Sequence, residues 1–113
     1  MNLTISHSND VAIVRVAEGR LMYPLLSEFA GAVTGLITTG SRKLVIDLAA
    51  VTYVDSASIG CLMDLYRQAT SAGGMLKLAG VQKRVETMLS MTGAQNFLEI
   101  HADEAAALAS FRG

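Results

Sequence analysis

Residues 45–60, which decide the fold, read VIDLAAVTYVDSASIG. Together with Leu44, the first part is a near-continuous apolar run interrupted by Asp47, and such a run is typical of a central strand buried on both faces of a sheet. The end of the stretch carries Asp55 and Ser56, residue types that favour the start of a helix. Apolar residues continue at helical spacing from Ile59, so the sequence predicts a helix over about 57–71.

The residues before this stretch predict an edge hairpin and a first helix. Residues 3–6 alternate between polar and apolar types, residues 8–10 have turn chemistry, and residues 11–16 form a second apolar strand. The single proline, Pro24, suits the first turn of a helix, where its missing N–H is tolerated. Behind it, one apolar helix face is formed by Leu26, Phe29, Ala30, Val33, Leu36 and Ile37.

The residues after the central stretch alternate between strand and helix. Strands are predicted over 75–79 and 97–100, Gly93 is expected to cap the helix between them, and Asp103 with Glu104 opens a last helix. Residues 1–113 are therefore expected to form one α/β domain. Its predicted architecture is a single, mostly parallel sheet of about five strands, with an N-terminal edge hairpin and about four helices.

The composition excludes several classes of function. With 9 Lys+Arg against 10 Asp+Glu, the chain lacks the basic excess of a general nucleic-acid binder or of a polybasic membrane anchor. One cysteine, Cys61, and two histidines cannot build a structural zinc cluster, and they favour a reducing, cytoplasmic setting. No apolar run reaches the roughly 18 residues of a membrane span, and no glycine-rich phosphate loop predicts a nucleotide cofactor.

Ser56 is the residue best placed to carry chemistry. It follows a strand end and lies at a helix start, where free N–H groups and the helix dipole favour an added anion. A phosphate on Ser56 would bring about −1.5 to −2 charges. The alternative interpretation is that Asp55 and Ser56 are only helix caps, because Asp-Ser before a helix is common.

An enzymatic function is not expected. The Gly-x-Ser-x-Gly frame of a nucleophilic serine is absent around Ser56 and Ser58, and nothing in the sequence places His7 or His101 beside them. Two aspartates near one sheet edge, without further ligands, do not predict a metal site. For Asp47 we expect hydrogen bonds at the end of its strand instead.

In their order and spacing these motifs resemble the STAS domain of bacterial anti-sigma factor antagonists, over nearly the whole chain. The resemblance is carried by Gly19-Arg20-Leu21, Val45-Ile46-Asp47-Leu48, Tyr53-Val54-Asp55-Ser56, Ile59-Gly60, Leu76-Lys77-Leu78-Ala79-Gly80-Val81 and Met91-Thr92-Gly93 with Phe97. It implies the STAS fold and a regulatory protein without catalysis.

The resemblance also implies a partner switch. In this family the unphosphorylated antagonist typically binds an anti-sigma factor that is also a serine kinase of the GHKL type, and the sigma factor is released. The kinase then phosphorylates the serine directly after the motif aspartate, and a PP2C-type phosphatase resets the antagonist. The matching serine here is Ser56. The residues expected to bind the partner are Asp55, Ser56, Ser58, Ile59, Met63 and Met22.

Three positions depart from the family pattern. Ser58 stands where the family usually has Gly, which makes Ser58 the alternative phosphorylation site. Met22 stands where the family often carries an acid, and Ala94 stands where Leu is common. The first two departures keep an alternative open: a STAS scaffold or a subunit of a transport complex that is not regulated by phosphorylation.

Overall fold

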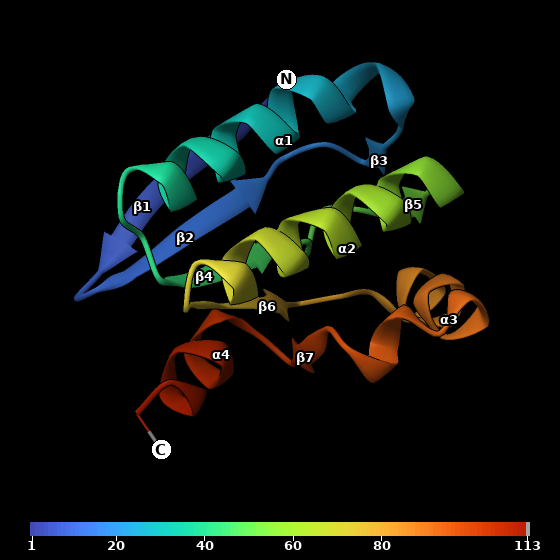
Figure 1. Cartoon of the computed structure of the whole chain (residues 1–113). Coiled ribbons are helices and arrows are strands. Elements are labelled where there is room, and N and C mark those ends of the chain that lie inside the picture. The colour runs from blue at the N-terminus through green and yellow to red at the C-terminus, as the bar shows by residue number, and fades with distance from the viewer. Residues whose placement is uncertain (113) are drawn as a thin grey trace.

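A five-stranded sheet forms the centre of the fold in the computed structural model, which describes residues 1–112 (Figure 1). Neighbouring strands follow the order β1-β2-β4-β6-β7. The β1–β2 pair is antiparallel and the other neighbours are parallel, which confirms the predicted sheet with its edge hairpin. The strands are β1 Leu3–Ser8, β2 Val11–Val16, β4 Lys43–Asp47, β6 Met75–Ala79 and β7 Glu99–His101.

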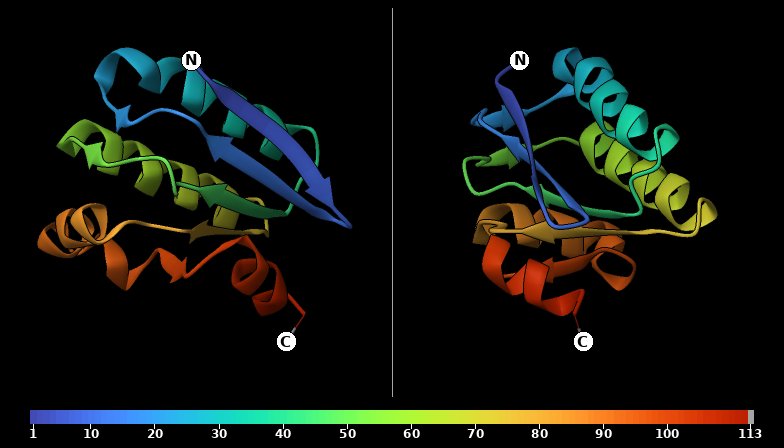
Figure 2. Two further views of the ribbon diagram at one scale, coloured as in Figure 1. Left: turned by 180° about the vertical axis from the view of Figure 1, so that it is seen from behind. Right: turned by 90° about the vertical axis from the view of Figure 1, so that its left-hand side faces the viewer.

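Helices cover both faces of this sheet. They are α1 Tyr23–Thr38, α2 Ser56–Ser71, α3 Lys83–Thr92 and α4 Glu104–Ser110, with a short 3-10 helix at Ala94–Asn96. Helices α1 and α2 run side by side along one face, and the edge-on view in Figure 2 shows both on the same side of the strands. Within residues 1–112, none of the helices is both long and apolar enough to cross a membrane.

The core divides into a large and a small part across the sheet. The large part packs α1, α2 and α3 against one face, with Phe29 and Leu62 fully buried in it. The small part packs α4, through Ala107, against the other face. Leu44, Val45 and Ile46 of β4 are all completely buried, as the predicted central strand requires.

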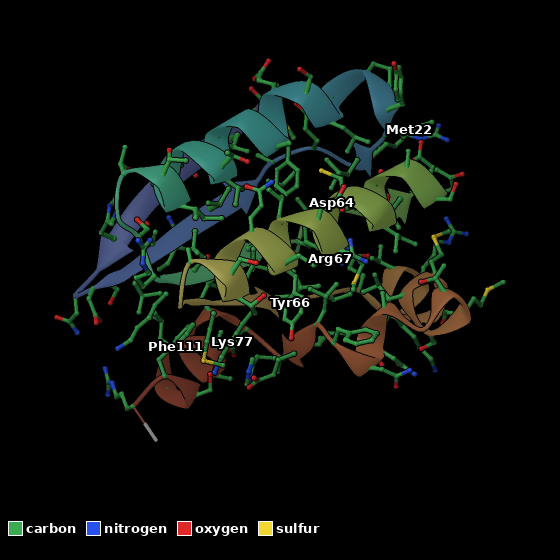
Figure 3. All side chains as sticks on the ribbon, in the orientation of Figure 1. Met22, Asp64, Tyr66, Arg67, Lys77 and Phe111 are labelled. Carbon is green, nitrogen blue, oxygen red and sulfur yellow. The ribbon has the colours of Figure 1, made fainter. Side chains whose placement is uncertain are left out.

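Helix α4 closes over a buried lysine. Lys77 of β6 is 3% exposed, and Figure 3 shows it beside Phe111, which follows α4. The Lys77 ammonium lies 4.2 Å from the centre of the Phe111 ring and donates a 2.7 Å hydrogen bond to Ser110 Oγ. A cation at this place also faces the last turn of α4, whose carbonyl groups favour positive charge. Lys77 therefore helps to hold α4 on the sheet.

Most helix and strand ends agree with the sequence, but β1 runs to Ser8, beyond the predicted end at residue 6, and β7 begins later than predicted. Gly93 caps α3 with a φ of 77°, a left-handed conformation that glycine adopts without strain, so its predicted role is confirmed. The predicted strand over 97–100 is wrong at its start. The chain forms a 3-10 turn at Ala94–Asn96, Phe97 stays 58% exposed, and pairing begins only at Glu99.

Two very short strands, which the sequence did not reveal, position the two long helices. Strand β3, Arg20–Leu21, pairs in parallel with β5, Tyr53–Val54, outside the five-stranded sheet. Helix α1 begins two residues after β3, and α2 begins two residues after β5. Because the two strands run in parallel, the starts of α1 and α2 lie next to each other.

Candidate functional site

The candidate site is formed where α1 and α2 begin. Met22 is the N-cap residue of α1, and Asp55 is the N-cap residue of α2. Leu21 and Val54 face each other in the β3–β5 pair and are buried, whereas their neighbours Arg20 and Tyr53 face outward. The Arg20 guanidinium lies 5.0 Å above the centre of the Tyr53 ring.

The Asp55 carboxylate accepts hydrogen bonds from the first turn of both helices. Its Oδ1 accepts a 2.8 Å hydrogen bond from the backbone N–H of Ser58, which confirms that Asp55 caps α2. Its Oδ2 accepts a 3.3 Å hydrogen bond from the backbone N–H of Tyr23, the first residue of α1. The hydrogen bond from the Ser58 hydroxyl is the main influence that holds the pKa of Asp55 below its ordinary value, and the two N–H groups act in the same direction. Asp55 is therefore ionised at neutral pH.

Ser56 is the exposed first residue of α2. Within residues 1–112, no hydrogen bond involves its hydroxyl group. The hydroxyl is thus available to a reagent from solution, at a helix start that favours an added anion.

Ser58 lies in the same helical turn and has the opposite environment. Its side chain is completely buried. Its Oγ lies within hydrogen-bond reach of two acceptors, the backbone carbonyl of Leu21 and Asp55 Oδ1, the latter at 2.5 Å. The single hydroxyl proton is therefore shared between two acceptors inside the protein.

An apolar groove begins at Ser56 and runs between α2 and α3. It consists of two adjoining hollows of about 350 and 340 Å³, and Ser56, Ile59 and Thr92 line both. The longest apolar side chains along the groove are Met63, Met88, Met91 and Phe97. Met91 is 81% exposed, so much of this apolar surface faces solvent.

The structure brings together most of the residues expected to bind a partner. Asp55, Ser56, Ile59 and Met63 all line the groove. Ser58 is buried beneath its start, and the half-buried Met22 lies at the start of α1, outside the groove lining (Figure 3).

Sequence reasoning missed the far wall of the groove. The sequence does not assign Met91, Thr92 and Phe97 to the site, because nothing local distinguishes an exposed apolar residue from a buried one. Six methionines in 113 residues were the one available signal.

The remaining candidates do not join this site. Asp47 Oδ1 accepts a 2.8 Å hydrogen bond from the backbone N–H of Ala49, as predicted for a strand end. His101 pairs with Glu99 at 2.7 Å, and His7 is exposed on β1. Burial raises the pKa of the half-buried Cys61 thiol, which disfavours the reactive thiolate. Within residues 1–112, no three His, Cys, Asp or Glu side chains gather as metal ligands would.

The fold and the site together define a small α/β domain with a capped, serine-bearing helix start beside an apolar groove. The chain belongs to the STAS domain family, because the family's sequence model matches residues 2–107. The resemblance seen in the sequence is thereby confirmed.

Individual relatives agree with this family. A Thermotoga neapolitana protein, named provisionally as an anti-sigma factor antagonist, is 29% identical over 77 residues, which are 68% of either chain. The crystal structure of a Thermotoga maritima protein with the same provisional name has a TM-score of 0.89 at 23% identity, covering 98% of this chain and 95% of that one. The phosphorylated form of the Bacillus cell fate determinant SpoIIAA has a TM-score of 0.76 at 14% identity, covering 98% and 100%. At such identities the two structures show a shared fold.

Proposed function

We propose that this chain is an anti-sigma factor antagonist, which binds an anti-sigma serine kinase while unmodified and is released by phosphorylation on Ser56. The names of its relatives support the first part of this proposal. The contrast between the two serines of the same helical turn supports the second part. Ser56 is exposed with an uncommitted hydroxyl, whereas Ser58 is buried with its proton engaged.

That contrast is the observation that carries the choice of Ser56 over Ser58. A kinase must bring a hydroxyl group in line with the γ-phosphate of ATP, so the accepting oxygen has to be reachable. The Ser56 hydroxyl meets this requirement without any change in the fold. The Ser58 hydroxyl would have to leave its two acceptors and the interior of the protein first.

The groove supplies the surface for the partner in this proposal. Ile59 and Met63 lie along it next to Ser56, and Met22 extends the contact toward the start of α1. Flexible methionine side chains fit such adaptable protein contacts.

A phosphate at Ser56 would disrupt this contact by its charge. The ionised Asp55 carboxylate is its immediate neighbour in the chain. Arg67 is the one cationic side chain in the groove lining, and it already pairs with Asp64 at 2.8 Å. A dianion buried against a partner without a cation to receive it is repelled and loses its hydration.

The proposed circuit needs two further proteins and no catalysis by this chain. The kinase is of the GHKL type and the phosphatase that resets Ser56 is of the PP2C type, as the family resemblance implies. The switch would operate in the cytoplasm, where the kinase has ATP.

The proposal is tested by phosphorylating the purified protein. Each GHKL-type serine kinase from the same genome is incubated with the protein and ATP, and the modified residue is mapped by mass spectrometry. We expect phosphate on Ser56 in the wild type and in Ser58→Ala, and none in Ser56→Ala. Modification of another residue would remove Ser56 from its role. If a kinase that binds the protein modifies no residue, Ser56 also loses this role, and the unregulated scaffold or transport subunit is favoured.

A further inference from the structure

Ser58 is an unusual residue for a protein interior. Among the described residues, the buried polar or charged side chains are Ser58 and Lys77, and Ser58 is completely shielded from solvent. A buried hydroxyl is tolerated when its hydrogen bonds are made inside the protein. The Ser58 hydroxyl makes them with groups from two separate segments, namely the Leu21 carbonyl at the end of β3 and the Asp55 cap of its own helix.

These hydrogen bonds belong to a small network that joins the two helix starts. Asp55 Oδ1 accepts hydrogen bonds from the hydroxyl and the backbone N–H of Ser58, and Asp55 Oδ2 accepts one from the backbone N–H of Tyr23. Ser58 adds the second connection, to Leu21, which lies 37 residues away in sequence. The turn that contains Met22 is therefore held to α2 from both of its sides, at Leu21 and at Tyr23.

We propose that Ser58 is a positioning residue, whose buried hydroxyl fastens the first turn of α2 to the β3–α1 connection. This link holds Ser56 and Met22 in a fixed position relative to each other. The fastening itself follows from the hydrogen bonds. Its role in a phosphorylation reaction rests on the function proposed above for Ser56.

The hydrogen bonds of Ser58 indicate what removal of its hydroxyl would do. The Leu21 carbonyl and Asp55 would each lose a partner, while the backbone N–H cap from Ser58 to Asp55 would stay. A buried carbonyl without its partner is unfavourable, so the turn around Met22 would shift to find another. Transfer reactions are sensitive to such shifts, because a misplacement of about 1 Å can slow them by about 100-fold.

The fastening is tested by three variants that need no partner protein. Ser58→Ala removes the hydroxyl, Ser58→Thr restores one, and Ser71→Ala removes an exposed hydroxyl from the far end of the same helix. NMR spectroscopy gives the Asp55 pKa from the pH titration of its carboxyl carbon, and amide exchange reports on the Tyr23 N–H. Circular dichroism checks that each variant is folded.

For Ser58→Ala we expect a raised Asp55 pKa and an exchange rate at Tyr23 that is faster by about tenfold, the equivalent of about 1.4 kcal/mol. Ser58→Thr should return both quantities toward the wild type, and Ser71→Ala should change neither. An Asp55 pKa and a Tyr23 exchange rate that stay at wild-type values in Ser58→Ala would overturn the fastening.

The link to phosphorylation is tested separately with the kinase. Ser56 in Ser58→Ala should be modified at least about tenfold more slowly than in the wild type, while Ser71→Ala keeps the wild-type rate. Equal rates in all three proteins would overturn the positioning role. If no kinase modifies the wild type, the proposed function fails, and the NMR measurements still decide whether Ser58 fastens the two helix starts.

Discussion

The guanidinium of Arg15 in β2 and the carboxylate of Glu104 in α4 form a two-point ion pair between residues 89 positions apart. Nε lies 2.6 Å from Oε2, and Nη2 lies 2.8 Å from Oε1. Asp47 stands next to Arg15 in the β2–β4 register, and its carboxyl group lies close enough to Glu104 for the two to influence each other's protonation. The ion pair fixes the first turn of α4 to the sheet, and the two neighbouring carboxyl groups make this attachment dependent on pH.

Replacing Glu104 should weaken the protein only above acidic pH. The hydrogen bond from Arg15, more than the neighbouring Asp47 carboxyl group, lowers the pKa of Glu104 from 4.5 to about 2. A carboxyl group whose pKa is lowered by folding stabilises the fold at pH values above its pKa in the unfolded chain. This stabilisation is lost as the pH falls through its pKa in the folded protein. Glu104→Gln should therefore melt below the wild type at pH 7, and the gap should close between about pH 4.5 and pH 2.

Thermal melts of both proteins across this pH range test the prediction. Glu86→Gln, at an exposed carboxyl group on α3, is the control for the general effect of removing one negative charge. A melting difference that stays constant down to pH 2 would contradict it.

Replacing Asp47 by asparagine should have the opposite effect. Burial is the main cause that raises the pKa of Asp47, and the neighbouring Glu104 carboxyl group acts in the same direction. The protonated Asp47 side chain therefore stabilises the fold at pH values below its ordinary pKa of 3.8. This stabilisation is lost as the pH rises through the pKa of Asp47 in the folded protein. Asparagine carries no charge, and its Oδ1 can still accept from Ala49. We expect Asp47→Asn to be more stable at pH 7 by up to about 1 kcal/mol, since the group is partly exposed. Urea unfolding at pH 7 and pH 4 measures this gain, which should shrink at the lower pH; a loss of stability at pH 7 would refute the argument.

A negative charge at position 56 should act as a permanent phosphate. Ser56→Asp places a carboxylate beside Asp55 at the groove entrance, so its affinity for the kinase should be at least about tenfold lower than that of the wild type, or about 1.4 kcal/mol. Ser71→Asp puts the same charge at the other end of α2 and should bind like the wild type. Calorimetric titration distinguishes the two, and undiminished binding by Ser56→Asp would rule out the electrostatic release.

Met91 should anchor the partner in the groove. Burial of an exposed methionine by a partner contributes about 1.5–3 kcal/mol, so Met91→Glu should weaken binding by tenfold or more without lowering the melting temperature. Met75→Glu is the control, because Met75 is also exposed (48%) and lies at the start of β6, away from the groove lining. Wild-type affinity in Met91→Glu would place the partner elsewhere.

Features set by local chemistry could be predicted from the sequence. The apolar run at Leu44, Val45 and Ile46 identified the central strand because a strand buried on both faces has no polar alternation. Pro24 marked the first turn of α1, Gly93 marked the left-handed cap of α3, and Asp55 marked the cap of α2. In each of these cases the residue's own backbone or side-chain preference decides the outcome.

Features set by distant contacts could not be predicted. Strands β3 and β5 are two residues long, too short for any periodicity, and each exists only because the other pairs with it. The burial of Ser58 depends on a carbonyl 37 residues away, so the sequence left Ser56 and Ser58 as alternatives. The exposure of Phe97 likewise depends on how the turn after Gly93 leaves the sheet.

The β3–β5 pair has a consequence for how such domains can diverge. Each of its strands gives one side chain to the core, Leu21 or Val54, and one to the surface, Arg20 or Tyr53. Substitutions at the outward positions can change the surface beside the start of α2 while the inward positions keep the packing intact. The packing and the exposed surface of this pair are thus set by separate residues, so such domains can vary one and retain the other.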